Sequence, residues 1–222
     1  MSKFECPKAF IFDLDGTIIN TVGSLRYCTS EAIALFGYPP VTDEEAMRFV
    51  GNGTRVLLRR SLEKYGDTDE EHYRKVITEY KRVFQTGCTR GNYVYEGLPE
   101  VLKSLKKQGI RLAVISNKPD EQTRKCVYDL YGRDLFELVY GEREGIPLKP
   151  DPTALKMLIA ELGVEPSECL YFGDGDTDVN ASNAAGCHTA AVTWGFRSRE
   201  ILEKCGPEFM IDRPEDILKL VM

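Results

Sequence analysis

The stretch AFIFDLDGTIIN, residues 9–20, decides the fold of this chain. It opens with the apolar run FIF, which is typical of a buried β-strand. Asp13 and Asp15 follow one residue apart, and Gly16 permits a sharp turn of the backbone behind them. Parallel strands are buried on both faces, and open α/β sheets bind ligands at the carboxyl ends of such strands. The stretch therefore predicts a parallel sheet with two carboxylates at its ligand-binding edge.

Two carboxylates so close together repel each other unless a cation lies between them or one of them takes a proton. The pair therefore predicts a hard cation, Mg²⁺, beside a carboxylate that acts as a nucleophile or as an acid and base. A second interpretation stays open at this point, in which Asp13 and Asp15 are only a helix-capping aspartate and a turn aspartate.

The composition of the whole chain limits the classes of protein to consider. The 222 residues suffice for one α/β core with a smaller insertion or for one large domain, and 42% hydrophobic with 29% charged residues is ordinary for a globular protein. The net charge is −6 without a basic run, so we expect no nucleic-acid partner, which would need a clustered positive patch. A small anionic substrate needs only a few local charges.

Cysteine usage and hydropathy indicate the compartment. The seven cysteines are scattered, odd in number and form no CxxC pair, which is typical of free thiols in a reducing compartment. Asp13 interrupts the apolar start, so no signal peptide is expected, and no apolar run approaches the ~20 residues that span a bilayer. We expect a soluble, cytoplasmic protein with no membrane partner and, with two histidines, no histidine-based metal site.

Helical patterns dominate residues 20–88, and Thr42 with Glu45 has the spacing of a capping box. From Gly97 onward helices alternate with short strands, as in a parallel sheet covered by helices on both faces. We therefore predict an α/β fold with a Rossmann-like, doubly wound parallel sheet core at 1–18 and 92–222 and an inserted α-helical cap at 19–91. The expected helices are 24–36, a short one through Met47 and Phe49 after the capping box, 54–65, 69–86, 99–107, 120–131, 153–162, one ending at 185, and 214–220. The expected strands after the first are 111–115, 138–140, 169–172 and 189–192.

Polar features stand directly after expected strands or in a rigid loop: the Asp13/Asp15 pair, Ser116, Lys149, and the Asp174/Asp178 pair. Because the ends of parallel strands face one way, these groups can converge although the sequence separates them. Carboxylates hold Mg²⁺, a lysine and a hydroxyl hold an anion, and one carboxylate remains free to attack, which suits phosphoryl transfer. Taken singly, Ser116 also fits a helix N-cap, Lys149 a solvated loop lysine, and the Asp174/Asp178 pair helix-capping acids.

Four motifs carry a resemblance to a known family: DLDGT at 13–17, the strand-end serine in VISN at 114–117, the lysine in LKPDP at 148–152, and GDGDTD at 173–178. In order and spacing they resemble the motifs of the haloacid dehalogenase superfamily, and of its phosphatases with a helical cap after the first motif. VGNG at 50–53 together with LKPDP is similar to phosphoglycolate phosphatases. The resemblance covers nearly the whole chain.

The resemblance implies a catalytic role for four of these residues. Asp13 would attack the phosphorus and form an aspartyl-phosphate. Asp15 would protonate the leaving oxygen and then take a proton from the water that releases phosphate. Ser116 would hydrogen-bond a phosphoryl oxygen, and Lys149 would neutralise the phosphoryl charge and the nucleophile.

The resemblance also implies the ligands of Mg²⁺. Asp174 would bind the ion directly, and Asp178 would bind one of its waters or orient Lys149. A carboxylate at Asp15 favours phosphate-ester chemistry, because the dehalogenases of the superfamily lack one there. The implied ligand set is Asp13, Asp15, Asp174 and Asp178.

Further candidate substrate contacts are Thr17, Asn117, Asn52 and Gly53. Asn52 and Gly53 lie between two expected helices of the cap, where they would reach the leaving group, although a plain interhelical turn explains them equally well. Relatives often have serine or threonine where this chain has Gly175, and the extra acid Asp176 beside it is expected to be solvated. Trp194 would line the rim of the site or simply pack.

The leading hypothesis is a Mg²⁺-dependent phosphatase acting on a small phosphorylated metabolite, with 2-phosphoglycolate as a candidate, as a monomer or homodimer. One alternative is a phosphosugar mutase similar to β-phosphoglucomutase, which would return the phosphoryl group from Asp13 to a sugar. A non-enzymatic alternative is a receiver domain that accepts phosphate as a signal, against which the helical insertion counts. The position of the insertion also predicts that the cap opens and closes about linkers near 18–20 and 88–92.

Overall fold

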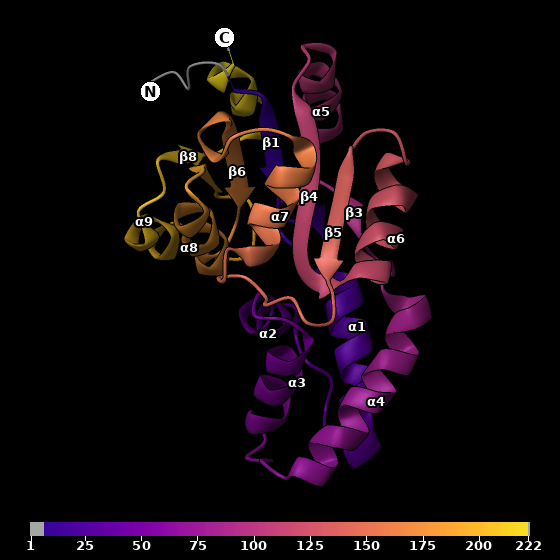
Figure 1. Cartoon of the computed structure of the whole chain (residues 1–222). Helices are drawn as coiled ribbons and strands as arrows, with labels where there is room; N and C mark the ends of the chain where they lie inside the picture. Colours follow the sequence, from indigo (N-terminus) through magenta and orange to yellow (C-terminus); the bar gives the residue numbers. More distant parts are fainter. Residues whose placement is uncertain (1–6, 222) are drawn as a thin grey trace. The chain divides into compact units, whose positions relative to one another are not determined.

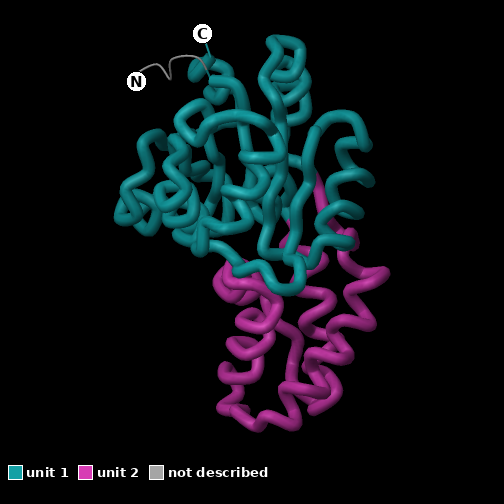
Figure 2. Tube along the Cα trace, in the orientation of Figure 1, with its two compact units in different colours: residues 1–20, 94–222 teal, residues 21–93 magenta. Residues whose placement is uncertain are grey.

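The computed structural model describes residues 7–221, so Cys6 lies outside the described residues. The chain divides into two compact units (Figure 2). Unit 1 combines the chain up to Asn20 with the chain from Val94 onward, and unit 2 is Thr21–Tyr93. The strands β2 (Ile19–Asn20) and β3 (Tyr93–Val94) form a separate two-stranded sheet at the two points where the chain passes between the units.

Unit 1 is built on a six-stranded sheet in the order β5-β4-β1-β6-β7-β8, and each neighbouring pair is parallel (Figure 1). Its strands are β1 (Ala9–Phe12), β4 (Arg111–Pro119), β5 (Leu138–Glu142), β6 (Cys169–Gly173), β7 (His188–Val192) and β8 (Phe209–Ile211). The chain winds outward from β1 in both directions, so the predicted doubly wound α/β fold is confirmed. The end of β1 is the point at which the strand order reverses, where open α/β sheets bind ligands.

Helices cover both faces of the sheet. β1 is apolar on both of its faces, and each face packs against helices. Phe10 and Phe12 belong to one core cluster, which also holds side chains of α5, α6 and the 3₁₀ helix η3. Ala9 and Ile11 belong to the opposite cluster, which holds side chains of α7 and α8. This alternation is the period of two that a β-strand imposes. The helices of unit 1 are α5 (Leu98–Lys107), α6 (Asp120–Tyr131), α7 (Thr153–Leu162), α8 (Asp176–Ala185), α9 (Arg199–Cys205) and the 3₁₀ helices η2 (Pro166–Glu168) and η3 (Pro214–Leu220).

Unit 2 is helical. Its elements are α1 (Val22–Ile33), the 3₁₀ helix η1 (Ala34–Phe36), α2 (Asp43–Phe49), α3 (Thr54–Glu63) and α4 (Glu70–Gly87). The predicted capping box is present at the start of α2, where the Thr42 hydroxyl accepts from the Glu45 amide and the Glu45 carboxylate accepts from the Thr42 amide. This arrangement satisfies two backbone donors that the first turn of a helix otherwise leaves unpaired.

The structure also differs from the sequence-based expectations in detail. The strand expected to end at Ile115 continues as β4 to Pro119, and the last expected helix, 214–220, is 3₁₀. The short elements α9 and β8 were not predicted. Short segments carry too few residues for a periodic pattern, so their structure depends on packing that the sequence does not display.

The described cysteines are all free thiols: Cys28, Cys88, Cys126, Cys169, Cys187 and Cys205. Across residues 7–221, none of the helices has the length and apolar character required to cross a membrane.

Candidate active site

The first loop of the site is shaped by a glycine. Asp13 directly follows β1, and its amide donates to the carbonyl of Phe172 at 2.8 Å, which fixes it to the neighbouring strand β6. Gly16 has φ of +89°, a conformation that side chains with a Cβ rarely adopt. A Cβ on Gly16 would also collide with the carboxylate of Asp174. The loop therefore needs glycine both for its turn and for its close approach to a second acid.

Strand register brings three loops to the same edge of the sheet. Phe12, the last residue of β1, pairs with Val114 of β4 and Phe172 of β6. The residues that follow these partners, including Ser116 and Asp174, therefore come out beside Asp13. This is the convergence that the sequence predicted for strand ends in a parallel sheet.

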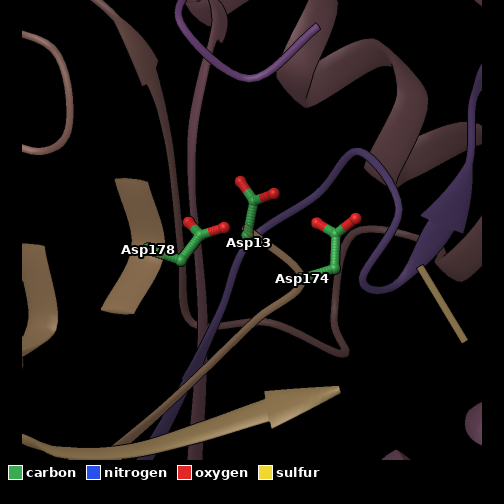
Figure 3. Close-up of side chains that lie close together, drawn as sticks. All are labelled: Asp13, Asp174 and Asp178. Atoms are coloured by element: carbon green, nitrogen blue, oxygen red, sulfur yellow. The ribbon is translucent and has the colours of Figure 1, made fainter. Parts of the chain in front are cut away.

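Three acids form a cluster at this edge. Asp13, Asp174 and Asp178 each offer a carboxylate oxygen, and these oxygens lie within 4.8 Å of one another. Figure 3 shows the three carboxylates directed to the same side. All three side chains are buried. Buried carboxylate oxygens in such a group are the donors that a hard cation such as Mg²⁺ takes, so the residues present fit a divalent metal ion.

The pKa shifts of Asp13 and Asp174 reflect the excess negative charge of the acid cluster. Burial, followed by the charge of Asp178, raises the pKa of Asp13 well above its usual range. The same two causes, in the same order, raise the pKa of Asp174 to about 7. Both shifts arise because the charged form is desolvated next to like charges, and a bound cation would relieve them.

Lys149 supplies a positive charge inside the cluster. Its Nζ lies 2.7 Å from Oδ1 of Asp13, 2.7 Å from Oδ1 of Asp178, 2.9 Å from the hydroxyl of Tyr171 and 3.3 Å from the carbonyl of Ile115. Burial by itself lowers the pKa of Lys149, but the charges of Asp13 and Asp178 outweigh it and raise that pKa well above its usual range. The lysine is therefore an ammonium group in contact with two of the three acids.

The loop that carries Lys149 is held by Asn117. The side-chain amide of Asn117 donates to the Lys149 carbonyl and accepts from the Lys149 amide, both at 2.9 Å. The peptide bond between Lys149 and Pro150 is cis. Asn117 thus fixes the loop from β4, and its predicted contact with substrate stays a prediction.

The end of β4 holds a second buried lysine. Nζ of Lys118 lies 2.5 Å from Oδ1 of Asp15, and the side chains are 2% and 12% exposed. The hydroxyl of Ser116 accepts a hydrogen bond from the Lys118 amide at 3.2 Å. Ser116 is not a helix N-cap, because α6 begins after Pro119. Asp15 therefore faces an ammonium group and is not one of the three acids of the cluster.

Two backbone amides and the hydroxyl of Thr17 orient the two acids that follow β6. Oδ2 of Asp174 accepts from the amide of Phe196 at 2.6 Å, and Oδ1 accepts from the hydroxyl of Thr17 at 3.3 Å. Oδ2 of Asp178 accepts from the amide of Gly175 at 3.1 Å. These hydrogen bonds fix the orientation of both carboxylates. Asp174 and Asp178 therefore accept from nearby backbone amides and also offer an oxygen to the acid cluster.

Trp194, which the sequence predicted to line the rim or to pack, ties the C-terminal part of the sheet to the first loop. Its indole N–H donates to the carbonyl of Thr17 at 3.0 Å. The predicted cap residues Asn52 and Gly53 lie in unit 2, in the break before α3, and their contact with substrate stays a prediction.

Sequence reasoning missed three groups that the structure places at this site. Lys118 directly follows a motif residue, and only its position next to Asn117 could have drawn attention to it. Tyr171 lies within the apolar strand β6, where a tyrosine is expected to pack. Phe196 contributes its backbone amide, which leaves no signal in the side chains.

Comparison with known proteins defines the class. A family model described as haloacid dehalogenase-like hydrolase matches residues 10–192. The chain belongs to this family, and it is an enzyme of the hydrolase class.

Within the family, the chain is similar to phosphoglycolate phosphatases. It is 32% identical over 215 residues to phosphoglycolate phosphatase 1 of Pseudomonas aeruginosa, with 96% of this chain and 79% of that protein covered. It is 31% identical over 222 residues to the phosphoglycolate phosphatase of Aliivibrio fischeri, with 98% of each covered. A crystal structure from Haemophilus somnus, described as a predicted phosphoglycolate phosphatase, matches with a TM-score of 0.90 at 26% identity and covers 97% of this chain and 98% of that one.

Proposed function

We propose that this protein is a Mg²⁺-dependent phosphatase that hydrolyses a small phosphate monoester through an aspartyl-phosphate on Asp13. The candidate substrate is 2-phosphoglycolate, which is what the names of the similar proteins in Pseudomonas aeruginosa and Aliivibrio fischeri indicate for those proteins.

The proposal depends most on how the two carboxylate oxygens of Asp13 are held. Lys149 holds Oδ1 of Asp13 at 2.7 Å, while no hydrogen bond within residues 7–221 reaches Oδ2. A nucleophile needs one fixed oxygen and one oxygen that is available to attack, and neighbouring positive charge to stabilise the charge that develops on the phosphoryl group.

The acid cluster would hold the metal ion. Asp13, Asp174 and Asp178 are the residues whose oxygens fit it. The resemblance also implied Asp15 as a ligand, and that role stays a prediction. Its side chain pairs with Lys118 outside the cluster of three acids, and we assign that side chain to proton transfer, as the resemblance implies. A bound Mg²⁺ would neutralise charge on the phosphoryl oxygens.

The reaction has two steps. In the first, the free oxygen of Asp13 bonds to phosphorus, the bond from phosphorus to the ester oxygen breaks, and Asp15 gives that oxygen its proton. In the second, Asp15 takes a proton from water, whose oxygen attacks phosphorus and releases phosphate from Asp13. Lys149 and the hydroxyl of Ser116 hold phosphoryl oxygens in both steps. The sequence motifs, together with the burial of Asp13, Ser116 and Lys149, support this assignment.

Unit 2 would act as the cap that selects the substrate. Asn52 and Gly53, in the break before α3, are its candidate contacts with the leaving group. The support for this role is the insertion of a helical unit between Asn20 and Val94, directly after the first motif.

The test is phosphate release from a panel of small phosphate esters, measured with Mg²⁺ and with EDTA. Wild type should turn over at least one ester only with the metal, and Asp13→Asn should abolish turnover. Asp176→Asn is the matched control: it removes a neighbouring acid of the same motif that lies outside the cluster, and it should retain activity.

Three outcomes would overturn the proposal. The first is absence of turnover with every ester. The second is a phosphorylated product in place of free phosphate, which would indicate a mutase. The third is uptake of a single phosphoryl group without turnover, which would indicate a receiver domain.

A further inference from the structure

We propose that Lys118 is a specificity-determining residue that binds an anionic leaving group, so that the preferred substrates carry a carboxylate one carbon away from the ester oxygen. This inference rests on the proposed function and names the residue of unit 1 that would recognise the part of the substrate that departs.

The two buried lysines of the site stand in different places. Lys149 contacts the nucleophile Asp13 and the metal-cluster acid Asp178, so its charge lies at the phosphoryl end. Lys118 contacts Asp15, at 2.5 Å. Lys149 is therefore assigned to the phosphoryl group, and Lys118 to the leaving group.

The partner of Lys118 is the residue that serves the leaving group. Because Asp15 gives its proton to the ester oxygen, a charge beside Asp15 lies next to the departing alcohol. In 2-phosphoglycolate, one methylene separates the ester oxygen from the carboxylate. That carboxylate would therefore come within reach of Nζ of Lys118 when the ester oxygen faces Asp15. An uncharged alcohol of the same length would make no ion pair there.

The backbone of Lys118 is fixed, unlike that of a surface lysine. Its amide donates to the hydroxyl of Ser116 at 3.2 Å, and its carbonyl accepts from the hydroxyl of Thr123 at 3.0 Å. Gly141 packs so closely that a Cβ there would lie 2.6 Å from the Lys118 carbonyl. The side chain is 2% exposed. A charged group fixed in this way loses little freedom on binding a ligand, which is the arrangement expected of a recognition group.

Burial makes the recognition selective. The attraction between an ammonium group and a carboxylate is larger where water is excluded. A site that places a buried charge against a substrate group discriminates against the analogue that lacks that group, because the analogue does not form the ion pair. Lys118 should therefore distinguish a carboxylate from an alcohol strongly.

The experiment compares 2-phosphoglycolate with 2-hydroxyethyl phosphate, in which an alcohol replaces the carboxylate. Wild type should prefer 2-phosphoglycolate in kcat/KM. Lys118→Met should lower kcat/KM for 2-phosphoglycolate by about 10²-fold more than it lowers kcat/KM for 2-hydroxyethyl phosphate, on the scale of discrimination by a buried polar partner. A loss shared by the two esters would report the contact of Lys118 with Asp15. Lys118→Arg should retain the preference because it retains the charge. Lys125→Met, on the exposed surface of α6, is the matched control and should leave both substrates unchanged.

A second measurement does not depend on any variant. Glycolate, the product that carries the carboxylate, should inhibit the wild-type hydrolysis of 2-hydroxyethyl phosphate, and ethylene glycol should not. Inhibition by glycolate should be lost in Lys118→Met if that variant folds, which its thermal unfolding will establish.

Two results would overturn the inference while leaving the phosphatase proposal intact. One is an equal loss on both esters in Lys118→Met, which would mean that the lysine acts only by positioning Asp15. The other is an equal kcat/KM of the wild type for the two esters. Failure of wild type to hydrolyse any ester would instead remove the proposed function itself.

Discussion

The sheet edge of unit 1 and the helix surfaces of unit 2 use their charged side chains in different ways. In unit 2, ion pairs such as Arg59 with Glu70 lie on exposed helix surfaces, where the side chains are 40% and 59% exposed. At the edge of the sheet in unit 1, Lys149 and Asp178 form an ion pair with 3% and 4% exposure. Exposed pairs contribute little to stability, whereas a buried pair is costly to form and costly to break. We infer that the buried charges are kept for chemistry and the exposed ones for solubility.

The largest effect should follow from breaking the buried pair. Lys149→Met keeps the length of the side chain but leaves Asp13 and Asp178 without their counter-charge. We expect activity to fall by at least about 10²-fold and the free energy of unfolding to fall by roughly 3–5 kcal/mol. Denaturant titration and phosphate release will measure the two effects.

The matched control for this prediction is Arg59→Met in unit 2, which removes one member of an exposed pair. It should shift the unfolding midpoint far less than Lys149→Met and leave activity unchanged. Equal shifts of the unfolding midpoint in the two variants would contradict the distinction between buried and exposed ion pairs.

A middle-sized effect should appear in the pH dependence of stability without metal. Burial and Asp178 raise the pKa of Asp174 from its ordinary value of 3.8 to about 7, so the folded protein binds this proton more tightly than the unfolded chain does. Stability should therefore fall as pH rises between these two values, by up to about 1.4 kcal/mol per pH unit for one such group.

Thermal unfolding of EDTA-treated protein at pH 5 and pH 8 will test this expectation. Mg²⁺ should restore stability most strongly at pH 8, where the acids of the cluster are ionised. In Asp174→Asn, both the decline with pH and the gain from Mg²⁺ should be reduced. A metal-free protein that is more stable at pH 8 than at pH 5 would contradict the expectation.

The smallest effect should come from a hydroxyl that supports the buried pair. Tyr171→Phe removes the group that accepts from Lys149 and donates to Asp178, each at 2.9 Å. Hydrogen bonds to charged groups are worth about 1.5–3 kcal/mol, so we expect a loss of stability in that range and a modest loss of kcat. Tyr140→Phe in β5, whose hydroxyl bonds to the partly exposed Glu161, is the control. Identical behaviour of the two variants would show that Tyr171 only packs.

The sequence predicted the parts of this molecule that local chemistry determines. The strand before Asp13 has the apolar run of a buried strand, and the helices at 120–131 and 153–162 coincide with α6 and α7 because their patterns are long and bounded by prolines or glycines. Lys149 could be identified because three prolines surround it.

Other features depend on contacts between distant segments and could not be predicted. The pairing of Lys118 with Asp15 requires the register of β4 against β1, which no local pattern contains. Tyr171 lies within an apolar strand, and that local pattern does not reveal the contacts of its hydroxyl with Lys149 and Asp178. The hydrogen bond from Phe196 to Asp174 involves a backbone amide, so any residue with an N–H at that position would satisfy it.

The central place of β1 has a consequence for the synthesis of the chain. Ala9 pairs with Arg111 on one side and with Cys169 on the other, so both neighbours of β1 are made long after it. Until the ribosome has passed Arg111, the first strand is an apolar segment with two open edges, the kind of segment that pairs with other chains. The active site becomes complete only when Phe196 has been added and can hold Asp174. A growing chain should therefore stay inactive until synthesis is almost finished, and fragments that stop before β7 should aggregate instead of showing partial activity.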